Sequence, residues 1–342
     1  MPAMPEFGCL PTAIGSMPHT NPDEACSIIM KHLPDIPFWP QLPKRSPKEK
    51  MIIQFSEGFP GVVIDGDKIQ IEPSANFESE LEQIYVDCEQ DDARKYGISP
   101  EYAAGLYAFL SKAMGNKIVK GQVTGPITWG LAVTRQDGLG ILYDDTLAEA
   151  AAKFLRLKAS WQESILKEIS PHPIIFVDEP YLSSFGSSFF ALSRQKVVSL
   201  LEEVLGGIAG LKGVHCCGNT DWSLLLNVRI DILSYDAYNF AESLTLYPQE
   251  VKNFLSRGGA IAWGIVPTGE EDLAKESVAS LKDRLEEAIA PFTRKGISFN
   301  KLKKQALLTP SCGLASLSSE ASAEEALLKL TRLSEEMRKS GV

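Results

Sequence analysis

This chain lacks long apolar runs, an excess of positive charge and a dense set of cysteines. No stretch approaches the roughly 18 consecutive apolar residues that cross a membrane, so we expect no membrane partner. Its 34 Lys and Arg residues are outnumbered by 44 Asp and Glu residues, which argues against nucleic acid as a partner. Six cysteines in 342 residues are too sparse for a secreted disulfide scaffold, and the first residues show no signal-peptide pattern. We therefore expect a cytoplasmic protein.

Short apolar runs alternate with longer segments of helical periodicity along the chain. Strands are predicted at 13–16, 118–124, 174–178, 213–217, 232–238, 260–266 and 306–309. Helices are predicted at 22–33, 77–90, 100–114, 146–169, 192–205, 220–228, 248–256, 270–295 and 323–340. Several strand runs are apolar throughout, which is typical of parallel strands that are buried on both faces. The alternation is typical of either a (β/α)₈ barrel or a doubly wound sheet.

The choice between these two folds depends on the segment after the first strand. A nucleotide-binding doubly wound sheet needs a glycine-rich turn there, whereas the sequence IGS at 14–16 leads into Met-Pro. Residues suited to chemistry follow several different strands, and a barrel gathers its active site from such positions. We therefore predict an α/β fold of the TIM-barrel type, a single (β/α)₈ domain over 1–342. Irregular excursions are expected at 34–50 and 58–73, and the sequence DGD at 65–67 predicts a hairpin within the second.

The strongest local signal is a cluster of soft metal ligands. His215, Cys216 and Cys217 close an apolar strand, and Cys312 follows another one. Alternate residues of a strand share one face, so His215 and Cys217 point together while Cys216 points away. One nitrogen and two sulfur donors select zinc, and three protein ligands leave a position open for chemistry. The alternative is that these thiols are ordinary buried cysteines, which behave as small hydrophobic residues.

A carboxylate is the candidate for the remaining metal position. Asp236 ends the strand that follows 213–217, and adjacent barrel strands bring their carboxyl ends together. Two thiolates and a carboxylate would make an electron-rich zinc site, which suits the activation of an incoming thiol better than hydrolysis. Asp236 is equally compatible with a helix cap.

Three further segments carry groups that can bind the charged ends of a small substrate. Asp178 and Glu179 follow a buried strand, where carboxylates either bind an ammonium group or lie in a solvated loop. Backbone N–H groups around Ile14 and Ser16, exposed by the intervening glycine, can receive a carboxylate. Glu57 is either another inward carboxylate or a strand end. These acidic groups favour an aminothiol as substrate.

Six short motifs together resemble a known family. In chain order they are TAIGSMPHT (12–20), TGPIT (124–128), VDEP (177–180), HCC (215–217), DILSYD (231–236) and PSCGL (310–314). They resemble the catalytic C-terminal barrel of cobalamin-independent methionine synthase, within the wider superfamily of uroporphyrinogen decarboxylases and corrinoid methyltransferases. The resemblance implies a zinc-dependent (β/α)₈ barrel that activates the thiol of homocysteine for methylation to methionine.

The resemblance also implies roles for individual residues. Motif matching assigns His215, Cys217 and Cys312 as zinc ligands. The family carries Glu as the fourth ligand, and this chain has Asp236, whose side chain is one methylene shorter.

The same matching implies a binding site for the amino-acid part of homocysteine. The backbone from Ile14 to Ser16 would hold its carboxylate, and Asp178 with Glu57 would bind its amino group.

The length of the chain differs from that of the larger family members. Those enzymes resemble two such barrels, one of which helps to hold a polyglutamyl folate, whereas 342 residues accommodate one. The sequence IPFWPQLP at 36–43 is similar to a segment of methylcobamide:thiol methyltransferases, which take their methyl group from a corrinoid. We therefore expect a methylated corrinoid protein as the methyl donor.

Three other functions stay open at this point. A methylcobamide:coenzyme M methyltransferase would need cationic groups for a sulfonate, whereas Asp178, Glu179 and Glu57 favour homocysteine. A porphyrinogen decarboxylase needs no metal and would leave the His/Cys/Cys set without a role. A closed structural zinc site in a binding protein would hold its metal with four tight ligands.

Overall fold

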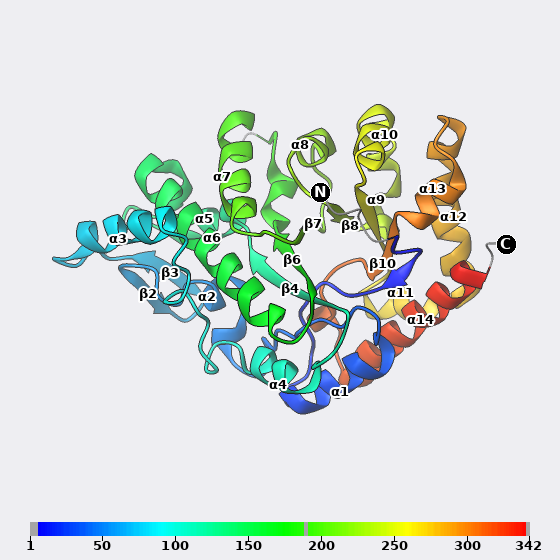
Figure 1. The fold of residues 1–342 in the computed structure, drawn as a ribbon, viewed down its shortest axis with the longest axis horizontal. Helices are drawn as coiled ribbons and strands as arrows, with labels where there is room; N and C mark the ends of the chain where they lie inside the picture. Colours follow the sequence, from blue (N-terminus) through cyan, green and yellow to red (C-terminus); the bar gives the residue numbers. More distant parts are fainter. Residues whose placement is uncertain (1–5, 188–190, 340–342) are drawn as a thin grey trace.

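The centre of the fold is a curled sheet of seven parallel strands, in the order β1-β10-β9-β8-β7-β6-β4 (Figure 1). It is seen in a computed structural model that describes residues 6–187 and 191–339. The strands are β1 (Leu10–Pro11), β4 (Ile118–Thr124), β6 (His172–Asp178), β7 (Leu211–Cys216), β8 (Ile232–Tyr235), β9 (Ala260–Val266) and β10 (Ala306–Pro310). Because every neighbouring pair is parallel, the carboxyl ends of all seven strands lie at one edge of the sheet. The α/β class and a TIM-barrel-like arrangement are as predicted.

Residues 36–41 occupy the eighth position of the barrel. They lie between the two edge strands of the sheet, β1 and β4, without forming a ladder with either. Two isolated parallel bridges hold this segment, from Phe38 to Lys120 and from Gln41 to Ser16. Two prolines in the segment lack the N–H group that a ladder needs, so continuous pairing is interrupted. The prediction of a complete (β/α)₈ barrel is therefore corrected to a barrel that is not fully closed by strand pairing.

The apolar core consists of two clusters, one inside the curled sheet and one between the sheet and the helices. The inner cluster takes alternate residues from the strands and consists of Phe7, Ile36, Ile174, Phe176, Ile232, Ala260, Ala262 and Leu307. The larger outer cluster packs the sheet against the helices and includes Tyr235 and Trp263. Since strand residues alternate between faces, Asp178 and Ser234 continue the inner rows toward the carboxyl edge.

Helices cover the outside of the sheet. They are α1 (Pro22–His32), α2 (Met51–Gln54), α3 (Phe77–Glu89), α4 (Ala104–Lys112), α5 (Pro126–Ala132), α6 (Asp145–Lys167), α7 (Arg194–Gly206), α8 (Trp222–Asn227), α9 (Ala237–Leu244), α10 (Pro248–Ser256), α11 (Glu270–Lys275), α12 (Val278–Arg294), α13 (Phe299–Lys304) and α14 (Glu320–Lys339). α6 packs on β4 and β6, whereas α12 and α14 pack on β9. Within the described parts of the chain, no helix is both long and apolar enough to cross a membrane.

The predicted hairpin is present. β2 (Val62–Asp65) and β3 (Lys68–Ile71) pair antiparallel, and Gly66 between them has a φ of 60°, which glycine adopts without strain. β5 (Val133–Thr134) adds to β3 and makes a separate three-stranded sheet. In Figure 1 this sheet and α3 lie at one end of the molecule, and α12 to α14 lie at the other.

Two predicted elements differ from the structure in a way that has a local cause. The first strand is β1, at 10–11, because the segment 13–16 leaves the sheet and pairs with Gln41 instead. The helix predicted at 270–295 is two helices, because the backbone of Glu276 is extended and Ser277 begins α12 with a capping box.

Candidate metal centre

His215, Cys217 and Cys312 come together at the carboxyl edge of the sheet. One potential ligand atom from each residue lies within 4.8 Å of the other two, and the three could hold a metal ion. His215 is the penultimate residue of β7 and Cys217 follows that strand, while Cys312 lies in the turn after β10. We call these three residues the metal-ligand group.

The two thiols of the metal-ligand group lie close enough to influence each other's acidity. A hydrogen bond from Cys217 and the neighbouring His215 lower the pKa of Cys312, and the same hydrogen bond together with burial raises the pKa of Cys217. His215 Nδ1 lies 3.0 Å from Ser234 Oγ, whereas its buried Nε2 has no hydrogen-bond partner within the described residues. One imidazole nitrogen without a hydrogen-bond partner and two neighbouring cysteine sulfurs are the donor set that zinc prefers, so these residues fit a zinc ion.

Cys216 lies on the opposite face of β7. Its side chain is completely buried and belongs to the outer apolar cluster. Burial raises the pKa of this thiol to about 12, so it stays protonated at neutral pH. This residue therefore packs as a small apolar side chain, away from the metal-ligand group.

Asp236 lies next to the metal-ligand group, but both of its carboxylate oxygens already accept hydrogen bonds from Asn239. The carboxylate accepts hydrogen bonds from Asn239 N at 2.9 Å and from Asn239 Nδ2 at 2.7 Å, and it caps α9. Burial raises its pKa, with Cys312 also raising it and His215 lowering it, so the charges of the group act on Asp236. It does not belong to the set of atoms within 4.8 Å. In this structure Asp236 is a helix cap beside the group.

Asp178 is the carboxylate on β6, the strand next to the one that carries His215. It pairs in register with His215 on the next strand and is 6% exposed. Its Oδ1 is buried and has no partner within the described chain. Burial raises its pKa to about 6, and Lys120 and His215 oppose that rise. An acceptor oxygen without a donor at this place is suited to a substrate N–H group.

Glu179 has a structural role instead. Its carboxylate accepts hydrogen bonds from Ile127 N at 2.9 Å, Thr128 N at 2.8 Å and Thr128 Oγ1 at 2.6 Å. These donors form the first turn of α5, where a negative charge is favourable. Gly125 allows this approach, because a Cβ at that position would overlap the Glu179 carboxyl group. Glu179 is completely buried and is therefore neither in a solvated loop nor open to a substrate.

The segment 14–16 lies against the turn that carries Cys312. Leu314 N donates to Ser16 O at 2.9 Å, and a Cβ at Gly313 would overlap Ser16 Oγ. On its other side, a Cβ at Gly15 would lie 2.8 Å from Gln122 Cδ. No hydrogen bond is present from the backbone N–H groups of residues 14–16 to any part of the chain that the structure describes. These N–H groups are therefore left without an acceptor among the described residues.

Glu57 has a different environment from the other proposed substrate ligands. Its carboxylate accepts a hydrogen bond from Ser99 N at 2.8 Å, and it acts electrostatically on Lys158 of α6. The described contacts of Asp178 and of the segment 14–16 do not include it.

Two residues of the site escaped the sequence reasoning, Lys120 and Ser234. Lys120 Nζ donates hydrogen bonds to Ile14 O and to Gln122 Oε1, and Ser234 holds His215. A lysine within an otherwise buried strand could have indicated the site, because a lysine is almost never fully buried unless its charge is paired. Ser234 gives no such signal, because serine is common in strands of every kind.

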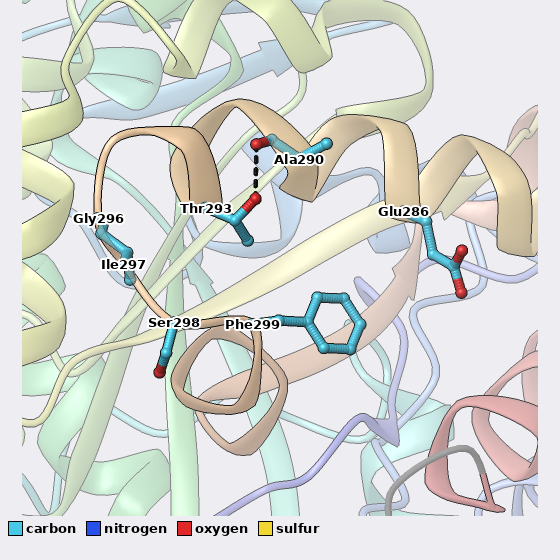
Figure 2. A pocket seen from close by; sticks show the side chains of 7 residues that line it. All are labelled: Glu286, Ala290, Thr293, Gly296, Ile297, Ser298 and Phe299. Atoms are coloured by element: carbon cyan, nitrogen blue, oxygen red, sulfur yellow. Dashed lines mark hydrogen bonds between the residues drawn. The ribbon is translucent and has the colours of Figure 1, made fainter.

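A surface depression of about 690 Å³ lies away from the metal-ligand group (Figure 2). It is lined by the end of α12 and the start of α13, including Glu286, Thr293 and Phe299. α13 leads into the amino end of β10, whereas Cys312 follows its carboxyl end. The depression is therefore at the opposite edge of the sheet from the candidate site.

Comparison with known proteins supports the fold. No protein-family model matches this chain, and none of the curated proteins matches it in sequence. Among solved structures, it resembles a B12-independent methionine synthase from Shewanella sp. W3-18-1 in complex with selenomethionine, with a TM-score of 0.63 and 17% identity over 97% of this chain and 98% of that one. It also resembles a methyltransferase from Methanosarcina mazei, with a TM-score of 0.58 and 15% identity over 98% of this chain and 94% of that one. At these identities the likeness shows a shared fold.

Proposed function

We propose that this protein is a zinc-dependent methyltransferase that converts homocysteine to methionine. The observation that carries the proposal is that the metal-ligand group lies beside both an unpartnered carboxylate oxygen, on Asp178, and the free backbone N–H groups of 14–16. The fold shared with a methionine synthase and a methyltransferase supports the same reaction class.

The metal-ligand group would hold the zinc ion through His215 Nε2 and the two thiols. A zinc ion held there would lower the pKa of a thiol bound to it, so that this thiol could act as a nucleophile at neutral pH. Ser234 would keep His215 in the tautomer with hydrogen on Nδ1, which leaves Nε2 free as a ligand. The hydrogen bonds from Asn239 to Asp236 argue that the fourth position is open to a substrate rather than filled by that carboxylate.

The neighbouring groups match the two charged ends of an amino acid. Asp178 would accept hydrogen bonds from the ammonium group, and the backbone N–H groups of 14–16 would donate to the carboxylate. Asp178 is opposite His215 in the strand register, and Ser16 contacts the Cys312 turn. An amino acid held at both ends therefore has its side chain next to the metal-ligand group.

We propose a methylated corrinoid, delivered by a corrinoid protein, as the methyl donor. The segments that link β1, β4, β6, β7, β8, β9 and β10 to their following helices contain no Lys or Arg. Four cations follow the eighth barrel position, at Lys44, Arg45, Lys48 and Lys50. Each already contacts a protein acceptor, namely Leu317 O, Glu49, Glu101 and Asp67 respectively, so these segments offer little to a polyanionic folate. In the proposed reaction the homocysteine sulfur attacks the methyl carbon, the new S–C bond forms and the Co–C bond breaks. The electron pair of that bond stays on cobalt as cob(I)amide, and the thiol proton goes to solvent.

A thiol that ends in a sulfonate is the second candidate acceptor, as in methyl transfer to coenzyme M. The buried cation of Lys120 at the site favours an anionic end group of any kind. The unpartnered Asp178 opposes a sulfonate and favours an ammonium group, so homocysteine fits both residues and coenzyme M fits one.

Methyl transfer by the zinc-supplemented protein tests the proposal. The donors are methylcobalamin and methyltetrahydrofolate, and the acceptors are homocysteine, coenzyme M and mercaptoethanol. We expect methionine from homocysteine and methylcobalamin, with a higher kcat/KM than for either other thiol. Turnover with methyltetrahydrofolate alone would contradict the corrinoid donor, a relevant arm because the Shewanella protein is described as B12-independent. Faster methylation of coenzyme M, or zinc-independent activity, would contradict the acceptor or the metal.

A further inference from the structure

Lys120 is a buried lysine inside the barrel, close to the proposed amino-acid site. Its side chain is completely buried, and it projects from the inner face of β4. The Nζ lies 4.6 Å from the centre of the Phe176 ring, which belongs to the inner apolar cluster. A charged group in such surroundings is costly unless its interactions compensate for the loss of water.

The hydrogen bonds of Lys120 connect it to the backbone next to the metal-ligand group. One N–H donates to Ile14 O and a second donates to Gln122 Oε1 at 3.2 Å. Gly15 packs closely against the same Gln122 side chain. Within the described residues, no carboxylate oxygen lies within 4.0 Å of Nζ. The ammonium group therefore has no ion-pair partner of its own in the described structure.

The electrostatics of the pair Lys120 and Asp178 agree with this geometry. Burial lowers the pKa of Lys120 to about 8, and Asp178 is the group that opposes this shift. Asp178 thus supports the charge of Lys120 from beyond ion-pair distance. A bound anion near Ile14 would support it further.

The carbonyl of Ile14 and the N–H of Gly15 belong to one peptide unit. A cation that donates to the carbonyl polarises this unit and makes the N–H a stronger donor. The backbone N–H groups of 14–16 have no described acceptor, and they form the proposed carboxylate site. Lys120 therefore strengthens the N–H donors of this site through the peptide group between Ile14 and Gly15.

We infer that Lys120 is a positioning residue for the acceptor: it fixes the segment 14–16 beside the metal-ligand group and gives it the positive charge with which it binds an amino-acid carboxylate. This inference rests on the proposed function. It predicts that Lys120 sets the preference for carboxylate-bearing thiols and has no part in metal binding.

The test compares Lys120→Met with Lys158→Met, a matched control. Lys158 is also completely buried, lies over the ring of Phe154 at 4.8 Å and donates to Gly97 O, which is outside the site. Affinity for each thiol is measured by calorimetry on zinc-supplemented protein, and KM and kcat are measured with methylcobalamin. The thiols are homocysteine, mercaptobutyrate, mercaptopropylamine and mercaptoethanol.

In Lys120→Met we expect KM and Kd for homocysteine and mercaptobutyrate to rise roughly ten- to a hundredfold, as for loss of a charge-assisted interaction. We expect values for mercaptopropylamine and mercaptoethanol, the zinc content and kcat at saturation to change less than about threefold. Lys158→Met should affect all four thiols alike. An equal loss for all four thiols in Lys120→Met, or no loss, would overturn the inference.

Lys120→Gln covers the case in which the Met variant does not fold. Its amide keeps a donor for Ile14 O without the charge, so we expect an intermediate loss confined to the two carboxylate thiols. Wild-type protein gives a further readout. The charge of Lys120 is present below its pKa of about 8 and lost above it, so the KM ratio of mercaptobutyrate to mercaptoethanol should rise above that pH. A flat ratio would overturn the inference. If the wild type shows no preference for homocysteine over mercaptoethanol, the proposed function itself fails.

Discussion

Replacing Ser234 with Ala removes the group that orients His215. Ser234 is completely buried, and its Oγ lies 3.0 Å from His215 Nδ1 in adjacent, in-register strands. With a metal on Nε2, the hydrogen of the ring must be on Nδ1, and in Ser234→Ala that N–H is buried without an acceptor. In the metal-free protein the ring can take the other tautomer, so the cost applies mainly to the metal-bound state.

The magnitude follows from this difference. Loss of a partner that orients a metal-ligating histidine weakens metal binding by roughly ten- to a hundredfold. This corresponds to about 1.4–2.8 kcal/mol, within the range for one buried polar group left without its hydrogen bond. We therefore expect Ser234→Ala to bind zinc about ten- to a hundredfold more weakly, as measured by competition with a chromogenic chelator.

Thr309→Val is the matched control for this experiment. Thr309 is also completely buried near the carboxyl edge of the sheet, but its Oγ1 has no hydrogen-bond partner in the described chain. Replacing it with the isosteric Val should leave the zinc affinity within about threefold of wild type. The reasoning is refuted if Ser234→Ala binds zinc as tightly as wild type, or if Thr309→Val weakens binding to the same extent.

Three other substitutions separate the metal ligands from the substrate ligands. Cys312→Ala should lose zinc at stoichiometric metal concentrations while Cys216→Ser retains it, by elemental analysis; the reverse pattern would mean that Cys216 faces the metal. Asp178→Asn should raise KM for homocysteine roughly ten- to a hundredfold and leave mercaptoethanol unchanged, because a charge-assisted hydrogen bond contributes about 1.5–3 kcal/mol. Equal losses in steady-state assays of both thiols would make Asp178 a structural residue.

Most of the parallel strands were predictable because their side chains are apolar on both faces, and β4 was predictable although its inner face carries Lys120 and Gln122. The runs at 118–124 and 260–266 coincide with β4 and β9. The segment 36–41 was not predictable as the eighth barrel position, because its prolines are typical of an excursion. Only contacts with residues distant in sequence, from Phe38 to Lys120 and from Gln41 to Ser16, place it between the sheet edges.

The site was predictable to the extent that strand alternation decides which way a side chain points. Cys217, directly after β7, lies near His215 as alternation predicts, and the thiol of Cys312 meets them because it follows the carboxyl end of another parallel strand, β10. Alternation alone could not show that Glu179 hydrogen-bonds to the start of α5, or that Asn239 donates hydrogen bonds to the Asp236 carboxylate. Both depend on which backbone N–H groups a helix start presents, and that is a property of the tertiary structure.

The carboxylate of Glu179 also has a consequence for how the protein opens. It connects the end of β6 to the first turn of α5, and its neighbour in sequence, Asp178, forms one wall of the candidate site. A fluctuation that frays the start of α5 would leave a buried carboxylate without donors, so it is coupled to disruption of β6. The helix start and the strand end therefore belong to one cooperative unit of local unfolding. The wall of the site has in effect the stability of the sheet rather than that of a surface loop.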